Sequence, residues 1–260
     1  MKKLVISLSF LAGIGQALAH TAAEPKLYQY STIDALLAGA YDGDLTVKQL
    51  KHEGNFGIGT FNRIDGEMVM VDGEVFQAKS DGSVVVASPT QKTPFAAVTS
   101  FSPSIQGSTT GPTTLKELEE QLDKIIVNKN LFYAIRVEGH FQQVTTRAIS
   151  PQDKPYRPLA EVSKTQSVFN YSDTDGVLVA FRSPPFSKGV NVPGYHYHYL
   201  SNDKKIGGHV LGLTLGNSVI KIMPILNIDI KIPSNEMFAN TDQAVDRTTE
   251  LESVERARKK

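Results

Sequence analysis

The sequence predicts a mostly β protein of the α/β class, close to α+β: an N-terminal mixed β-sheet with helices, followed by a C-terminal, open β-barrel-like sheet. Two observations support this fold class. Short apolar segments separated by tight-turn dipeptides dominate the chain, and only two stretches have the spacing of apolar residues that a buried helix face requires. The 260 residues, 40 % of them hydrophobic, suffice for one large core or two small ones.

The N-terminal segment, residues 1–19, has the pattern of a secretory signal peptide. Two lysines precede an apolar run that reaches Gly15, and the small-residue motif at 17–19 predicts cleavage before His20. The run is too short to span a bilayer. We therefore expect an exported protein, periplasmic or secreted, that is slightly acidic and has no membrane association after cleavage. The alternative is a buried N-terminal helix.

The next segments predict one helix and an antiparallel meander. Ser31 or Thr32 caps a run with apolar residues at helical spacing, which ends near Asp42-Gly43. Residues 56–87 then contain three Asp-Gly dipeptides, which tolerate the positive φ angles of tight hairpin turns. Short apolar strands between such turns are typical of a meander.

A second helix and a linker complete the predicted N-terminal domain, residues 20–161. The polar segment 102–114 is expected to be a loop, and the helix after it opens with the capping box Thr114-x-x-Glu117. Two strands are expected around Glu138-Gly139. The proline-rich segment 150–161 then predicts a soft boundary, so that residues 162–260 form the barrel-like domain and a charged C-terminal tail.

Composition excludes several classes of partner and site. The formal net charge is zero and no basic stripe is present, which argues against nucleic acid and favours a small-molecule partner. The chain has no cysteine, so it can form neither disulfides nor thiolate metal sites. Any metal ion must be held by nitrogen and oxygen atoms.

Three of the six histidines lie in one predicted β-hairpin, "GYHYHYLSNDKKIGGHVLGL". Because side chains alternate along a strand, His196 and His198 point to one face and the tyrosines between them to the other. If "SNDKKI" connects the strands, Leu200 pairs with Gly207 and His198 lies opposite His209. Directly opposed residues share a face, with Cβ atoms roughly 5 Å apart. All three imidazoles are therefore expected to converge.

Three imidazoles on a rigid hairpin indicate a catalytic metal site with open coordination positions. The ligand type favours zinc, but imidazole also binds iron, nickel or copper. The residues alone leave other readings open: strand histidines without a metal, an exported metal-binding protein for zinc storage or transport, and carbonic-anhydrase-like or cupin-like lyases. A cupin would be expected to have a glutamate shortly after the His-x-His pair, where this chain has Ser201, Asn202 and Asp203.

The chain also resembles the α-acetolactate decarboxylase family over nearly all of its predicted mature length. The resemblance rests on five segments in order: "FGIGTFNRIDGEMVMVDGEVFQ", "TPFAAVTSF", "FYAIRVEGHFQQVTTRAISPQ", "KPYRPLAEV" and "VPGYHYHYLSNDKKIGGHVL". The last segment, with His-x-His and Gly-Gly-His, is the most specific.

The resemblance implies a zinc-dependent carboxy-lyase that converts (S)-2-acetolactate to (R)-acetoin and CO2 through a metal-stabilised enediolate. It also implies a homodimer. By correspondence with the family's motifs, the metal ligands would be His196, His198, His209 and Glu255. Substrate-binding residues would be Thr60, Glu67 and Arg147, and the catalytic residues Glu67, Arg147 and Glu255. Without the family, the two glutamates and the arginine would be interpreted as ordinary surface charges.

Overall fold

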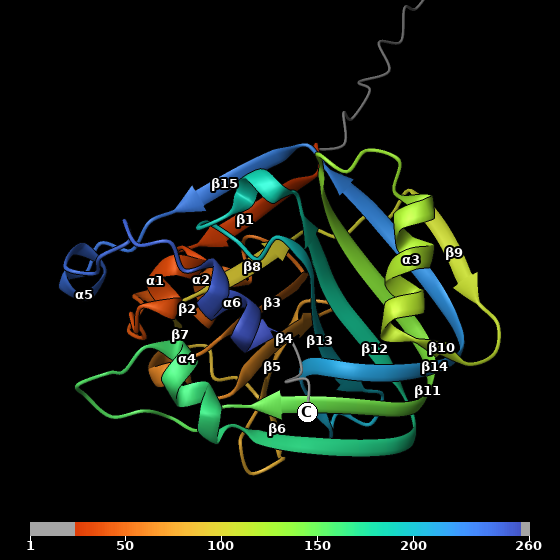
Figure 1. The fold of residues 1–260 in the computed structure, drawn as a ribbon, viewed down its shortest axis with the longest axis horizontal. Helices are drawn as coiled ribbons and strands as arrows, with labels where there is room; N and C mark the ends of the chain where they lie inside the picture. The colour runs from red at the N-terminus through yellow and green to blue at the C-terminus, as the bar shows by residue number, and fades with distance from the viewer. Residues whose placement is uncertain (1–23, 256–260) are drawn as a thin grey trace, which may run out of the picture.

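The structure is a computed structural model that describes residues 24–255. It is a mostly β, α+β fold built on two large sheets packed against each other, with short helices at their edges (Figure 1). The predicted signal peptide, residues 1–19, lies outside the described residues. Among residues 24–255, none of the helices is both long enough and apolar enough to cross a membrane.

The first sheet is mixed and seven-stranded, in the order β15-β1-β8-β3-β4-β5-β6. Its strands are β1 (Lys26–Tyr30), β3 (Phe56–Thr60), β4 (Glu67–Val71), β5 (Glu74–Ala78), β6 (Val84–Val86), β8 (Ala96–Thr99) and β15 (Asn227–Lys231). β3 to β6 form the predicted meander. At the β4–β5 turn, Asp72 and Gly73 both have positive φ, as expected of an Asp-Gly hairpin. A separate two-stranded sheet pairs β2 (Leu45–Thr46) with β7 (Lys92–Thr93).

The second sheet contains the long strands of the chain. They are β11 (Phe132–Ala148), β12 (Ser167–Ser183), β13 (Gly194–Ser201) and β14 (Gly207–Ile225), with β9 (Ile105–Thr109) and β10 (Thr113–Thr114) paired to β14. The order is β14-β11-β12-β13, and β13 also pairs with β14. That last pairing covers three residue pairs, from His198↔His209 to Leu200↔Gly207. The barrel is therefore closed only near the hairpin turn and open beyond it.

Helices fill or cover the ends of the sheets. They are α1 (Ile33–Leu37), α2 (Val47–Leu50), α3 (Leu115–Ile125), α4 (Leu159–Val162), α5 (Glu236–Ala239) and α6 (Thr248–Glu255), with single turns of 3-10 helix at η1 (Asn62–Ile64), η2 (Ser163–Thr165) and η3 (Pro185–Ser187). The two predicted caps are confirmed: Thr32 caps α1, and Thr114 with Glu117 forms a complete capping box on α3. α1 ends at Leu37, earlier than predicted.

Two apolar cores position these layers. One lies inside the barrel, where Leu118 and Leu122 of α3 pack against Tyr197 and Tyr199 of β13. The other lies between the two sheets and includes Ile58 and Val69 of the first sheet and Val179 of β12. The tyrosines of the histidine hairpin therefore face α3, which leaves the opposite face of β13 for the histidines.

Two predictions about the strands are wrong. Segment 102–114 is not only a loop, because Ile105–Thr109 forms β9 along the edge of β14. The two strands expected around Glu138-Gly139 are one continuous strand, β11. Gly139 is not a turn residue: a Cβ there would lie 2.3 Å from the Asn217 carbonyl oxygen, so glycine is needed for the close approach of β14.

The predicted boundary near Glu161 lies between β11 and β12, which are neighbouring antiparallel strands of one sheet. Both predicted domains thus contribute strands to the second sheet. The chain passes from the first sheet to the second between Thr99 and Ile105, and β15 returns to the first. The division into residues 20–161 and 162–260 stays a prediction.

Candidate metal centre

The histidine hairpin has the register that the sequence predicts. Leu200 pairs with Gly207 and His198 with His209. Parity along β13 places His196 on the same face as His198. The hairpin therefore brings three imidazoles together on the face of the barrel that is turned away from α3.

The three histidines form a compact and buried cluster. Each is at most 8 % exposed, and one ring nitrogen from each lies within 4.8 Å of the others. Nε2 of His196 is 3.2 Å from Nδ1 of His209. Two nitrogens bound at 2.0–2.1 Å to one tetrahedral zinc ion would be separated by roughly 3.3 Å, so this spacing suits a shared metal ion.

The protonation state of His198 follows from its partner on β4. Its Nδ1 lies 2.7 Å from the carbonyl oxygen of Met68 and must donate, because a carbonyl only accepts. The other nitrogen, Nε2, therefore carries a lone pair, and it is buried without a hydrogen-bond partner among the described residues. A buried lone pair held in place by a hydrogen bond at the opposite nitrogen is the usual arrangement of a metal-binding histidine.

Glu67 and Arg147 lie directly beside the histidines. β4 begins at Glu67, immediately before Met68, and Arg147 on β11 pairs in register with His209 on β14. Nη1 of Arg147 donates to Oε1 of Glu67 at 2.7 Å, and Oε2 of Glu67 is 3.6 Å from Nε2 of His198. Both side chains are less than 10 % exposed, so they are part of the buried cluster and not surface charges.

Glu255, the last residue of α6, also lies beside the histidines. Its Oε2 lies 3.6 Å from Nε2 of His196 and 3.8 Å from Nε2 of His209, while its Oε1 is 3.9 Å from Arg147. Leu251 and Val254 on the inner face of α6 pack into an apolar cluster with α1 and α4. This packing explains why an otherwise charged segment reaches the site.

Thr60 supports the turn before Glu67. It pairs in register with Glu67, and its hydroxyl donates to the Gly66 carbonyl oxygen at 2.7 Å. Gly66 has a φ of +76°, and a Cβ there would lie 2.3 Å from the Ala78 carbonyl oxygen. In this structure the Thr60 hydroxyl thus holds the Asp65-Gly66 turn that orients Glu67.

Burial favours the neutral form of the two glutamates and the three histidines of the cluster. It raises the pKa of Glu67 and of Glu255 to about 7 in each case, against the lowering effect of Arg147. Burial also lowers the pKa of His196 to about 3, and the pKa values of His198 and His209 lie well below their usual range. The imidazoles are therefore neutral near pH 7, which is the form that binds metal ions.

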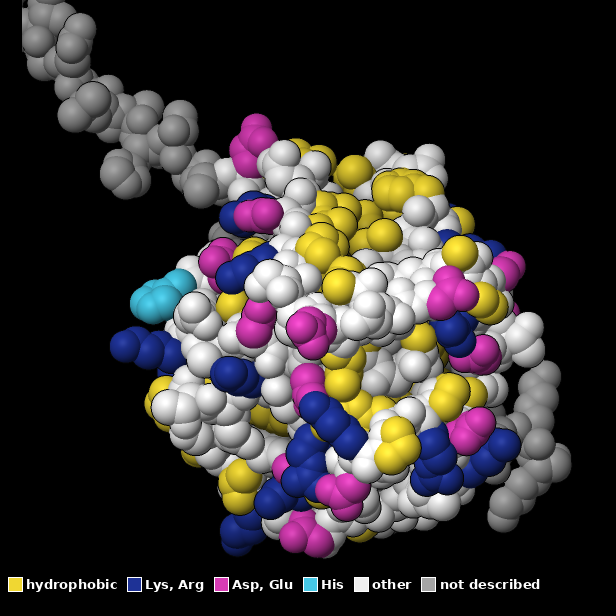
Figure 2. Space-filling view, turned by 90° about the vertical axis from the view of Figure 1, so that its left-hand side faces the viewer, with side chains coloured by type: hydrophobic (Ala, Val, Ile, Leu, Met, Phe, Trp, Pro, Cys, Tyr) yellow, Lys and Arg dark blue, Asp and Glu magenta, His cyan; other side chains and the backbone are white. Residues whose placement is uncertain are grey.

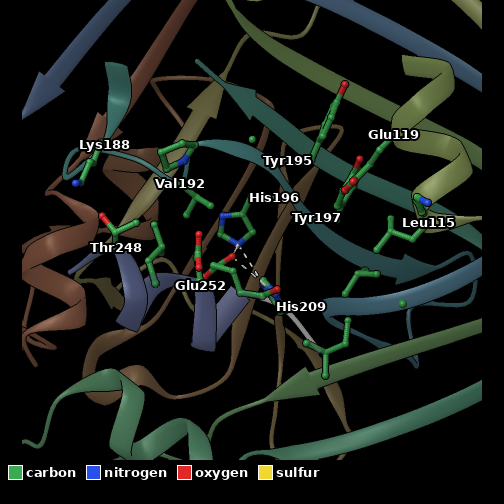
Figure 3. Close-up of a pocket in the computed structure, with 18 of the residues that line it drawn as sticks. Leu115, Glu119, Lys188, Val192, Tyr195, His196, Tyr197, His209, Thr248 and Glu252 are labelled. Atoms are coloured by element: carbon green, nitrogen blue, oxygen red, sulfur yellow. Dashed lines mark hydrogen bonds and ion pairs between the residues drawn. The ribbon is translucent and has the colours of Figure 1, made fainter. Parts of the chain in front are cut away.

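A cavity of about 950 Å³ opens onto the cluster. Figure 3 shows His196 and His209 facing each other, with α6 on one side and Tyr195, Tyr197 and α3 on the other. Within residues 24–255, the lining of this cavity includes His196, His209 and Glu255 but not Glu67, Arg147, His198 or Thr60. The cavity therefore meets the cluster at His196, His209 and Glu255.

The structure brings together all the site residues expected from the sequence. Thr60 contacts the site only indirectly, through the Asp65-Gly66 turn that precedes Glu67. The sequence did not predict one further group of the site, the Met68 carbonyl that orients His198. No sequence signal could have identified it, because every residue has a carbonyl oxygen. Buried neutral imidazoles of this spacing suit zinc and other divalent transition metals, and the donor set does not distinguish among them.

Comparison with known proteins points to one family. A family model described as alpha-acetolactate decarboxylase matches residues 27–244, which include every site residue named above except Glu255. The alpha-acetolactate decarboxylase of Methylococcus capsulatus is 42 % identical over 230 residues, covering 88 % of this chain and 88 % of that protein. The enzyme of that name from Methanosarcina mazei is 43 % identical over 236 residues, 90 % and 81 % of the two chains.

The fold agrees with that of a solved structure. The crystal structure of alpha-acetolactate decarboxylase from Bacillus subtilis strain 168 superposes with a TM-score of 0.88 at 34 % identity. The match covers 89 % of this chain and 100 % of that one.

Proposed function

We infer that this chain, which belongs to the α-acetolactate decarboxylase family and shares its carboxy-lyase activity on acetolactate, performs the reaction with zinc at the histidine triad. The observation that carries this inference is the convergence of three buried, neutral imidazoles, one of which has an unpartnered Nε2 fixed by the Met68 carbonyl. His196, His198 and His209 would hold the ion, with Glu255 beside it. Bound zinc would act as a Lewis acid that polarises the substrate's ketone.

The reaction requires groups that stabilise the negative charge that develops on the substrate. Acetolactate is a β-keto acid, so when the bond to its carboxylate breaks, the electron pair moves towards the ketone oxygen and leaves an enediolate and CO2. Arg147 is permanently charged and carries a planar fork of donors. We assign it the role of holding the substrate carboxylate and then the developing oxyanion.

A proton must then reach one face of the enediolate for (R)-acetoin to form from (S)-2-acetolactate. Glu67 is a candidate donor, because it is buried beside His198 and oriented by Arg147 and by the turn that Thr60 supports. Arg147 is the other candidate, acting directly or through a water molecule. An exported metal-storage protein is not favoured, since such a role gives no reason for Arg147 and Glu67 to be buried next to the triad.

The reaction can be tested on the purified protein with racemic acetolactate. We expect release of CO2 and of acetoin in which the (R) enantiomer predominates, measured by gas chromatography on a chiral column. Bound metal without acetoin would refute the reaction. Racemic acetoin would refute delivery of the proton by an oriented side chain.

Glu255 offers a separate test of the metal site. Glu255→Gln should lower zinc affinity by at least about tenfold, because the carboxylate beside His196 and His209 is lost. Glu252→Gln is the matched control, since Glu252 also lies on α6 and lines the cavity. Competition with a chromogenic chelator measures both. Equal affinities in the two variants would remove Glu255 from the site.

Two further features belong to this proposal. We propose export after cleavage before His20, which mass spectrometry of the native protein tests: a mature N-terminus at Met1 would contradict it. We also propose the homodimer that the family resemblance implies. Neither is needed for the chemistry at the triad.

A further inference from the structure

The loop between β12 and β13, residues 184–193, leads directly into the histidine hairpin. It contains the 3-10 turn η3 and ends three residues before His196. Part of this loop lines the cavity that opens onto the triad, namely Pro185, Lys188, Gly189, Val192 and Pro193. The conformation of the loop therefore shapes the cavity beside the histidines.

A network of side-chain amides ties this loop to β1. Nε2 of Gln29 donates to the carbonyl oxygens of Ser31 and Val190, at 2.9 and 2.6 Å. Nδ2 of Asn191 donates to Oε1 of Gln29 at 2.6 Å, and Oδ1 of Asn191 accepts from the backbone N–H of Val192, also at 2.6 Å. Each amide thus uses both its nitrogen and its oxygen. Buried polar networks that are fully bonded in this way fix one conformation.

The network lies inside the protein and is reinforced by α1. Figure 2 shows the side of the molecule that carries β1 and α1, where acidic and basic side chains are interspersed with hydrophobic ones. Gln29 and Asn191 are buried beneath the surface, with 1 % and 2 % exposure. The N–H of Ile33 donates to the carbonyl of Val190. The loop therefore cannot shift without leaving buried polar groups unpaired, which is costly.

Val192 is the loop residue through which this rigidity reaches the wall of the cavity. It is 3 % exposed and belongs to an apolar cluster that includes Leu251 of α6. The same helix ends at Glu255, whose carboxylate lies 3.6 Å from Nε2 of His196. Figure 3 shows Val192 and His196 towards the α6 side of the cavity and Leu115 on the α3 side. Val192 thus supplies apolar wall near the triad.

The cavity as a whole is much larger than acetolactate requires. Its volume of about 950 Å³ is in the range of pockets that hold drug-sized molecules, whereas acetolactate is a small keto acid. Any limit on substrate size must therefore come from side chains near the reacting groups. The carbon that loses CO2 also carries a methyl group, which can bond neither a metal ion nor Arg147. This methyl group requires an apolar wall beside the triad.

We propose that Val192 limits the size of the alkyl group that the enzyme accepts on the carbon bearing the carboxylate, and that the Gln29–Asn191 network keeps Val192 in place. This inference rests on the proposed function, because it requires acetolactate to react at the histidine triad. The substrate class is that of 2-hydroxy-3-oxo acids with a short 2-alkyl group. A longer group would meet the Val192 side chain.

The size limit can be tested with acetolactate and with the analogue that has a propyl group in place of that methyl. The measured quantity is the ratio of kcat/KM for the propyl analogue to kcat/KM for acetolactate. Val192→Ala should raise this ratio by at least about tenfold and Val192→Ile should lower it, since one methylene in an apolar pocket changes kcat/KM by about 10–200-fold. Leu115→Ala is the matched control, because Leu115 lines the same cavity beside α3, and it should leave the ratio unchanged.

Failure of this inference can be told apart from failure of the proposed function. If the unmodified protein forms acetoin but both Val192 variants keep its ratio, or Leu115→Ala shifts the ratio as much as Val192→Ala, the assignment of Val192 is overturned and the reaction stands. If the unmodified protein forms no acetoin from acetolactate, both are refuted.

A double-mutant cycle tests whether Asn191 is a positioning residue that acts through Val192. Asn191→Ala removes the bonds to Gln29 and to the Val192 N–H, so it should also raise the ratio. The double variant with Val192→Ala should then have the same ratio as Val192→Ala alone, because the two changes act on one side chain. Loss of stability by itself would lower the amount of folded enzyme equally for both substrates. Independent, multiplicative effects of the two substitutions would contradict the positioning role.

Discussion

His198→Ala is expected to abolish metal binding and to lower kcat for acetolactate by at least about 10²–10³-fold. The substitution removes the Nε2 lone pair that is buried without a partner, together with the ring that the Met68 carbonyl holds in place. Loss of one well-placed group that stabilises transition-state charge typically costs that much in rate. Metal content by atomic emission and acetoin formation measure the two effects separately.

The matched control is His140→Ala. His140 lies on β11, is 42 % exposed and contacts Asp175 on the surface. Its removal should change neither metal content nor turnover. Retention of metal and activity by the His198 variant would exclude the triad as the metal site, provided circular dichroism shows that both variants are folded.

Arg147→Ala is expected to keep the metal and lose turnover by about 10²-fold or more. Among the described residues, Arg147 makes no hydrogen bond to a histidine of the triad. In the same part of the chain, no other permanently charged cation is buried beside Glu67, so no other side chain can replace Arg147 in pairing with the substrate carboxylate. The variant should also unfold more easily, since breaking a buried ion pair costs about 3–5 kcal/mol. Metal content, kcat and a thermal unfolding curve distinguish these effects.

Arg136→Ala provides the comparison on the same strand. Arg136 bonds Asp72 and Glu138 near the surface, away from the triad. We expect its activity to match that of the unmodified protein. A fully active Arg147 variant, or one that loses metal as completely as the His198 variant, would contradict the assignment of Arg147 to substrate charge.

The histidine hairpin was predictable because two local rules determine it. Side-chain parity fixes which residues share a face, and a six-residue connection with Leu200 opposite Gly207 fixes the register. Helix caps were predictable for a similar reason, since Thr114 and Glu117 interact within one turn.

Long-range features of the fold were not predictable in this way. Glu138-Gly139 has the composition of a turn, but tertiary packing against Asn217 on β14 keeps the strand continuous. β9 has few apolar residues and is a strand only because the edge of β14 offers partners.

The site could be predicted only in part, because its charged residues are brought together by long-range packing. Glu67, Arg147 and Glu255 are separated by 80 or more residues, and each is surrounded in sequence by ordinary charged or polar residues. Only the family resemblance singled them out. What makes them a site is burial beside the triad, which depends on packing between β4, β11 and α6.

Zinc titration of the metal-depleted protein tests the central claim most directly. The protein would be stripped with a chelator, assayed for acetoin formation, and assayed again as zinc is returned. Activity should vanish on depletion and then rise in proportion to bound zinc, with a break at one ion per chain. Full activity in protein that contains no bound metal would contradict the account.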